Sequence, residues 1–125
     1  MIRLKELLKE FNLKQKDLYD LIGVTRDVVT NIIQGRSIVD DKKIALFSKF
    51  FMVSSDYFLG LSNDGIYVKV LDKLYSINKE QFELYSSINM LSYVNNVRIL
   101  NVSSLEDIEF INSNVPSIKL KKESI

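Results

Sequence analysis

Residues 15–36 read QKDLYDLIGVTRDVVTNIIQGR, and this stretch decides how the first half of the chain folds. Its apolar residues predict one helix over about 15–22 and a second over about 26–34, packed against each other across a short turn. Gly23 accepts the positive φ that such a turn needs, and Thr25 is a good N-cap for the second helix. The positions expected to face each other are Leu18, Ile22, Val24, Val29 and Ile32.

With those positions buried, the second helix presents a polar outer side. Arg26 can donate two hydrogen bonds to guanine, Asn31 can pair bidentately with adenine, and Asp27 can accept from the cytosine amino group. Because the start of such a helix enters the major groove, these residues are candidates for contacting DNA bases, together with Thr30. Asp27 has a second interpretation, since the helix dipole favours a carboxylate in a first turn without any ligand. Thr30 has one too, as a merely exposed residue.

Several residues around this helix are placed to contact DNA phosphates. They are Lys14, Gln15, Arg36, Lys42 and Lys43. Backbone amides at the start of the helix over 15–22 can assist them. For Lys42 and Lys43, a solvated helix face is the alternative. Ile33, near the end of the reading helix, is interpreted as core, as a thymine-methyl contact or as a partner surface.

The rest of the first 60 residues also predicts helices. Leu4, Leu7, Leu8 and Phe11 follow helical spacing over 2–11, a further helix is expected over 41–51, and a short one near 55–59. The turn-rich GLSNDG of residues 60–65 then reads as a linker.

Beyond the linker, residues 66–94 predict two more helices. Tyr67, Val70, Leu71 and Leu74 repeat the helical spacing, and Asn78 with Gln81 forms a capping-box pattern before a helix over 79–94. Their apolar faces are wider than a two-helix hairpin buries, so we expect them to pack on the first domain or on a second chain. Ile99, Leu100 and Val102 suit a short strand or a loop, Ser104 with Asp107 can begin one or two helical turns, and the order of residues 95–125 stays open.

Composition excludes several classes of protein. The 125 residues include 46% hydrophobic and 26% charged residues, a net charge of +1, and neither Cys nor His. Disulfides, thiolate catalysis, the usual zinc sites and the commonest general base are therefore absent, and we expect neither an enzyme nor a cofactor or small-molecule ligand. The N-terminus lacks a signal-peptide core, and no apolar run approaches the ~18 residues of a membrane span, so a cytoplasmic protein without membrane contact is expected.

The segments RLKELLKE, LKQKDLYDLIGVT, NIIQGR and VSSDYFLG together carry a family resemblance. Residues 2–60 resemble the helix-turn-helix domain of the Cro/CI-type (XRE) family of phage and bacterial repressors. The resemblance implies a five-helix lambda-repressor-like domain that binds a two-fold DNA operator as a dimer. It places base-reading positions on Arg26, Asp27, Asn31 and sometimes Val28, and phosphate contacts on Gln15 and Arg36.

The sequence thus predicts an all-α fold, with a DNA-binding domain over 1–61, a helical dimerisation segment over 66–94, and a tail over 95–125. The expected function is that of a sequence-specific transcriptional regulator, a repressor bound as a homodimer to an inverted-repeat operator. The alternative is an interaction module of the antitoxin or anti-repressor type, which keeps the fold with weak or no operator binding.

Overall fold

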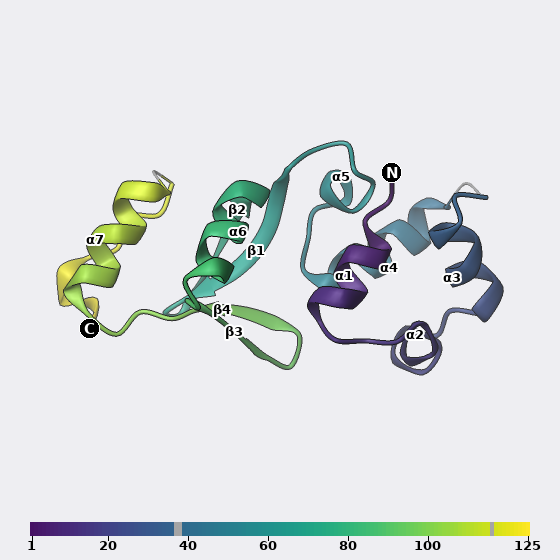
Figure 1. Ribbon diagram of the computed structural model, residues 1–125, viewed down its shortest axis with the longest axis horizontal. Helices are drawn as coiled ribbons and strands as arrows, with labels where there is room; N and C mark the ends of the chain where they lie inside the picture. Colours follow the sequence, from purple (N-terminus) through teal and green to yellow (C-terminus); the bar gives the residue numbers. More distant parts are fainter. Residues whose placement is uncertain (37–38, 116) are drawn as a thin grey trace. The chain divides into compact units, whose positions relative to one another are not determined.

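The computed structural model of the chain describes residues 1–36, 39–115 and 117–125. These residues divide into two units, Met1–Asn63 and Asp64–Ile125, each held together by its own internal contacts (Figure 1). None of the helices within the described residues is both long and apolar enough to cross a membrane.

Five short helices make up the first unit. They are α1 (Leu4–Glu10), α2 (Gln15–Ile22), α3 (Arg26–Ile33), α4 (Asp41–Phe51) and α5 (Ser55–Phe58). Local hydrogen bonds set their starts, because side-chain oxygens of Thr25, Asp40 and Ser54 accept backbone N–H bonds at α3, α4 and α5. The five predicted helices of this half of the chain are confirmed.

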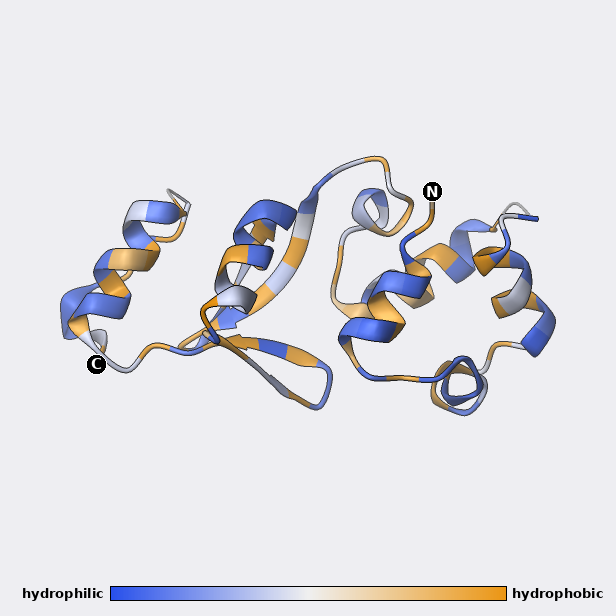
Figure 2. Ribbon diagram, in the orientation of Figure 1, coloured by the Kyte–Doolittle hydropathy of each residue, from blue (hydrophilic) through white to orange (hydrophobic). Residues whose placement is uncertain are grey.

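The apolar sides of these helices meet in one core. Leu4, Leu18, Val29, Phe47, Phe51 and Phe58 are completely buried. The rings of Phe47 and Phe58 stack with centroids 5.4 Å apart and so join α4 to α5. Figure 2 shows the corresponding alternation of hydrophobic and hydrophilic bands along these helices.

Arg3 joins the N-terminal helix to the chain after α5. Its Nε donates to the Tyr57 carbonyl at 2.8 Å, one Nη donates to Asn63 Oδ1 at 2.8 Å, and the guanidinium lies 4.2 Å from the centroid of the Tyr57 ring. Gly60 has a φ of +76°, and a Cβ there would overlap the carbonyl oxygen of Met1. Only glycine fits such a position without strain, so both ends of the first unit are held together tightly.

A four-stranded mixed sheet with two helices forms the second unit. The strands are β1 (Asp64–Val70), β2 (Lys73–Asn78), β3 (Leu91–Val94) and β4 (Val97–Leu100), in the order β2-β1-β4-β3. β1–β2 and β3–β4 are antiparallel hairpins, whereas β1 and β4 pair in parallel at the centre. Helix α6 (Lys79–Ser87) connects β2 to β3, and α7 (Leu105–Asn114) follows β4.

The predicted all-α fold is therefore wrong, because residues 64–70 and 73–78 form strands. Ile66, Val68 and Val70 are buried, while Tyr67 and Lys69 between them are more exposed, which is the period of two of a strand. β-Branched residues suit this half-buried pleated surface. Over so short a segment a helical and an alternating pattern both fit the apolar residues, and pairing between β1 and β2 decides for the strand.

The predicted capping box is present at the start of α6. Asn78 Oδ1 accepts from the Gln81 N–H at 2.8 Å, and Gln81 Oε1 accepts from the Asn78 N–H at 2.9 Å. The helix predicted to reach residue 94 nevertheless ends at Ser87, because Asn89 takes a φ of +58° and β3 then begins at Leu91. The helical appendage over 66–94 is thus correct only for α6.

The remaining residues are also largely regular. Of the residues predicted as a short strand or a loop, Ile99 and Leu100 lie in β4 and Val102 follows it, and Ser104 caps α7. The prediction left the order of 95–125 open, and of this segment residue 116 lies outside the described residues. A 3₁₀ turn over Lys122–Ser124 follows near the C-terminus.

A buried arginine and a buried tyrosine stand out in the core of the second unit. Arg98 on β4 is 0% exposed, donates to the Tyr67 carbonyl at 3.3 Å, and lies 5.9 Å from the centroid of the Phe82 ring on α6. Tyr85 on α6 packs edge-on against Phe110 of α7, with centroids 6.1 Å apart. Its hydroxyl has no hydrogen-bond partner among the described residues, and burial raises the pKa of this phenol.

Candidate functional site

The turn between α2 and α3 sets the direction of α3. Gly23 ends α2 in the left-handed conformation, with a φ of +69°, and the Thr25 hydroxyl then accepts from the Val28 N–H at 3.3 Å to begin α3. The residues predicted to face each other are placed accordingly: Leu18, Val24, Val29 and Ile32 are buried, and Ile22 is half-buried. This packing fixes which side of α3 remains outside.

All five predicted base-contacting residues lie on α3. Arg26 and Asp27 are exposed in its first turn, and Val28, Thr30 and Asn31 are half-buried. The arrangement offers a guanidinium, a carboxylate, an amide, a hydroxyl and one apolar side chain on one short helix. These are groups that distinguish base edges in a major groove. Ile33, at the end of α3, is half-buried.

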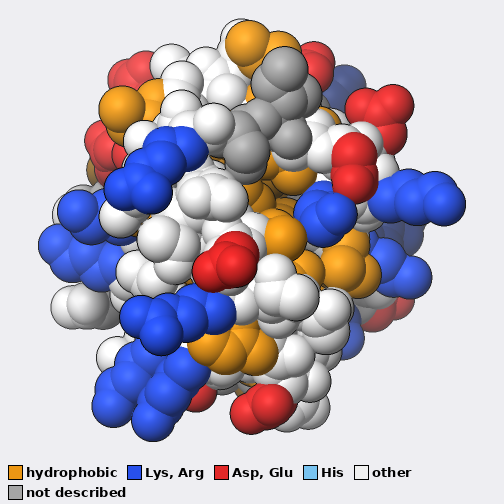
Figure 3. Space-filling model, turned by 90° about the vertical axis from the view of Figure 1, so that its right-hand side faces the viewer, with side chains coloured by type: hydrophobic (Ala, Val, Ile, Leu, Met, Phe, Trp, Pro, Cys, Tyr) orange, Lys and Arg blue, Asp and Glu red, His pale blue; other side chains and the backbone are white. Residues whose placement is uncertain are grey.

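The predicted phosphate-contacting residues come from three places around α3. Lys14 and Gln15 lie at the start of α2, Arg36 follows α3, and Lys42 lies in the first turn of α4, all four exposed. The Arg36 N–H donates to the Asn31 carbonyl at 2.9 Å, so the backbone of Arg36 is tied to the end of α3. In Figure 3, Lys and Arg side chains lie toward the margins of this side of the first unit, with hydrophobic, uncharged polar and some acidic side chains between them.

Lys43 differs from the other four, because its ammonium is already paired. Its Nζ lies 2.9 Å from Asp40 Oδ2, while its backbone N–H donates to Asp40 Oδ1 at 2.9 Å. The hydrogen bond from the Lys43 side chain is the main cause that holds the pKa of Asp40 below its ordinary value. The sequence interpretation missed this pair, although opposite charges three residues apart on a helix were a readable signal.

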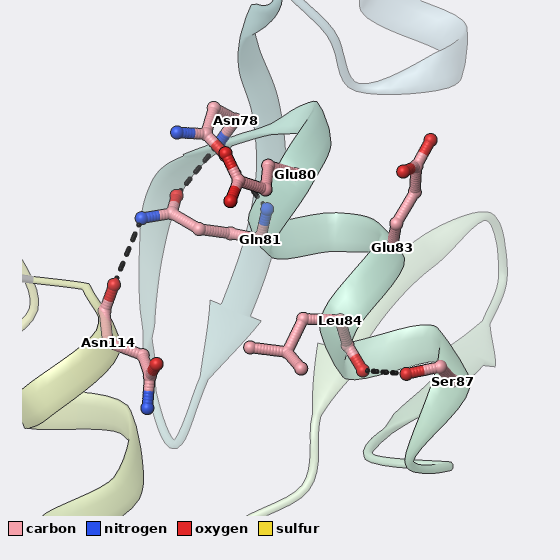
Figure 4. Close-up of a pocket in the computed structure, with 7 residues that line it drawn as sticks. All are labelled: Asn78, Glu80, Gln81, Glu83, Leu84, Ser87 and Asn114. Atoms are coloured by element: carbon pink, nitrogen blue, oxygen red, sulfur yellow. Dashed lines mark hydrogen bonds between the residues drawn. The ribbon is translucent and has the colours of Figure 1, made fainter.

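The second unit carries a pocket of about 570 Å³ beside α6 (Figure 4). Its polar groups largely bond to each other: Gln81 Nε2 donates to the Asn114 carbonyl at 3.2 Å, and Ser87 Oγ donates to the Leu84 carbonyl at 2.7 Å. The first of these bonds links α6 to α7. Among the described residues, no set of three or more His, Cys, Asp or Glu side chains is placed to hold a metal ion.

Comparison with known proteins agrees with the geometry of the first unit. Residues 4–58 match the family model described as helix-turn-helix. The match begins at the first residue of α1 and ends at the last residue of α5, so it covers the five helices of the first unit. No curated protein and no solved structure matches the chain.

Proposed function

We propose that the chain is a transcriptional repressor, because residues 4–58 match the helix-turn-helix family model and a helix-turn-helix can place one helix in the major groove of DNA. It binds an inverted-repeat operator as a dimer and blocks transcription by occupying that operator. DNA binding is assigned to residues 1–61. Arg26, Asp27 and Asn31, with Val28 and Thr30, contact bases.

One observation carries the proposal: the side of α3 that is not needed for packing is polar and accessible at its N-terminal end. Val29 and Ile32 are buried, whereas Arg26 and Asp27 are exposed in the first turn. The N-terminal end is the part of such a helix that contacts base edges in the major groove. Lys14, Gln15, Arg36 and Lys42 then contact phosphates, which position the helix, and Lys43 joins them only where its ammonium leaves Asp40.

Dimerisation follows from the small size of this reading surface. One helix of eight residues, Arg26–Ile33, contacts only a few base pairs. Repressors with such helices gain affinity by placing two of them on half-sites roughly 34 Å apart. The sequence predicts that the dimer contact is made by helices over 66–94. With those residues now divided between strands and α6, we assign it to the second unit.

Selection from random duplex DNA by the full chain, read by sequencing, tests this function. An enriched inverted repeat with a half-site spacing of about one helical turn is expected. Binding to that repeat should also weaken steeply with salt, as phosphate contacts require. Recovery of unselected sequence, with no shift of any duplex in a gel, would overturn the proposal.

The competing function is that of an interaction module of the antitoxin or anti-repressor type. Two observations favour it: the net charge of +1 supplies little attraction to DNA, and Asp40 neutralises one candidate phosphate ligand. Such a module would form a stable complex with another protein while shifting no operator, so the same selection distinguishes the two functions.

A further inference from the structure

The two faces of the sheet in the second unit differ in what covers them. Ile66, Val68 and Val70 of β1 are buried on one face, where Phe82 of α6 meets Arg98. Residues between them in the sequence point to the other face, because side chains alternate along a strand. We call this second side the outer sheet face. Its residues are more exposed than the buried ones opposite, so it is a candidate for contact with another molecule.

The strand register places eight residues on the outer sheet face in two rows. Paired residues on neighbouring strands share a face. The pairs of Lys69 with Leu74 and with Ile99, and of Ile99 with Ser92, define one row across the sheet: Leu74, Lys69, Ile99, Ser92. Two residues away along each strand, the second row reads Ser76, Tyr67, Val97, Val94.

The outer sheet face is mainly apolar and carries no carboxylate. Leu74 and Val94 are each 58% exposed, and Tyr67, Val97 and Ile99 are half-buried. Lys69 is the one charged residue among the eight. The largest apolar patch on a small protein is often a functional surface, which makes this face a candidate for contact with a partner.

The order of side chains across the rows fits a second copy of the same face. Two packed sheets keep their strands within about 30° of each other at about 10 Å separation. We place the two-fold axis between the sheets and parallel to the strands. It sets β2 against the partner's β3, and β1 against the partner's β4, whereas an axis across the strands would set Lys69 opposite the partner's Tyr67. Leu74 then lies opposite the partner's Ser92, and Ser76 opposite the partner's Val94. A large side chain thus meets a small one at both corners.

The same axis also keeps the Lys69 side chains of the two copies apart. It places Lys69 opposite the partner's Ile99 rather than opposite the second lysine, so like charges do not meet. The alkyl stem of Lys69 can pack on that isoleucine while the ammonium reaches water at the rim. Each contact occurs twice, as in every two-fold interface between identical chains.

The size of the face limits how strongly it can hold two copies. Four strands about 4.8 Å apart and two rows of residues give roughly 300 Å² per copy, against about 800 Å² per partner in stable interfaces. Free chains should therefore associate weakly. On an operator, two bound chains reach a high effective concentration, and a small contact then suffices.

We propose that the outer sheet face joins two copies of this chain through a two-fold axis parallel to the strands, and that this contact couples binding at adjacent DNA half-sites. The coupling rests on the DNA-binding function proposed above, whereas the contact itself does not. Two experiments keep these parts separate.

The first experiment compares a duplex with one half-site and a duplex with two, using the full chain. The wild-type chain should bind the second half-site about 5- to 150-fold more tightly than the first, the usual range of coupling between sites. Leu74→Asp and Val94→Asp should keep half-site affinity and lose the coupling. Leu105→Asp is the matched control, because Leu105 is 50% exposed but lies on α7. Coupling that survives Leu74→Asp, or that Leu105→Asp removes, would overturn the proposal.

The second experiment needs no DNA, and it exploits the absence of cysteine from the chain. Chains with Leu74→Cys and chains with Ser92→Cys are mixed at high concentration with a short bis-maleimide. The mixture should cross-link, and each variant alone should cross-link far less, because residue 74 faces residue 92 of the partner. Equal cross-linking of Leu74→Cys alone, or of a Leu105→Cys control, would contradict this geometry. Cross-linking without any DNA shift would leave the contact intact and refute the proposed function instead.

Discussion

Asp40→Asn is expected to make DNA binding more sensitive to salt. The Asp40 carboxylate has two roles, because one oxygen accepts the Lys43 N–H that caps α4 and the other pairs with the Lys43 ammonium. Asparagine caps helices as well as aspartate does, so the variant should keep the first role. It loses the negative charge that holds the ammonium, and Lys43 then becomes available to a phosphate.

The size of the effect follows from the number of cations that meet phosphates. Each contributes about −0.9 to the slope of log K against log salt concentration. With Lys43 held by Asp40, the cations Lys14, Arg36 and Lys42 give a slope of about −2.7 per copy, and release of Lys43 makes it about −3.6. For two copies, Asp40→Asn should lose about twelve-fold more affinity than the wild-type chain between about 50 and about 200 mM salt.

Fluorescence anisotropy titrations of the selected operator, at several salt concentrations, measure these slopes. Lys43→Ala should leave the slope of the wild-type chain almost unchanged, and the double variant should return Asp40→Asn to the wild-type slope. A thermal melt of Asp40→Asn checks that α4 keeps its cap. Equal slopes for the wild-type chain and Asp40→Asn would refute the reasoning. So would a flatter slope for Lys43→Ala alone, since Lys43 would then reach a phosphate despite Asp40.

Three further predictions concern base reading, a buried hydroxyl and acid stability. Arg26→Ala should lower discrimination at one base pair by roughly 5- to 150-fold, whereas Arg36→Ala should weaken all sequences alike; competition with single-base operator variants separates the two. Tyr85→Phe removes a buried hydroxyl that has no partner among the described residues, so urea melts should show an unfolding free energy that is unchanged or higher by about 1 kcal/mol, and a loss of that size would contradict this. Hydrogen bonds from Ser103 hold the pKa of Asp107 below its ordinary value of 3.8. Asp107 therefore contributes stability that is present above about pH 4 and lost as the pH falls through its lowered folded pKa. Asp107→Asn should flatten the acid side of the stability curve, and curves of equal steepness would speak against it.

The first unit was predictable because its local signals agree with each other. Gly23 and Thr25 mark the turn between α2 and α3 in the sequence, and the same residues end α2 and begin α3 in the structure. Helices whose caps, breakers and apolar spacing all indicate the same bounds leave little for long-range contacts to decide. That agreement also placed the five base-contacting candidates together on one helix.

The second unit was not predictable in this way, because its sheet depends on contacts between distant residues. β1 pairs in parallel with β4 through Lys69 and Ile99, thirty residues apart in the chain. No local sequence pattern predicts that pairing. The apolar residues of the segment that forms β1 also fit a helical spacing. Two local start signals, the capping box at Asn78 and Gln81 and the cap at Ser104, correctly predict where α6 and α7 begin.

The roles of the candidate site residues stay predictions, and the structure adds which of their charges are already paired. Sequence spacing places Lys43 near the other cations, yet the pair with Asp40 depends on the rotamers that the two side chains adopt at the start of α4. Likewise, the outer sheet face has no counterpart in a helical interpretation of residues 66–94. It exists only once the register aligns Leu74, Lys69 and Ile99.

The contact with a DNA half-site and the contact between two chains are both small. Each is therefore weak alone, and each depends on the other. A single copy has three candidate phosphate-contacting cations besides Lys43 and one short reading helix, so its affinity for a half-site is modest. The outer sheet face is too small to hold free chains together. Coupling raises operator occupancy only when both contacts form at once, so occupancy should rise steeply with protein concentration. A repression assay would therefore show the same loss for Arg26→Ala and for Leu74→Asp. Half-site affinity distinguishes them, because only the first variant should change it.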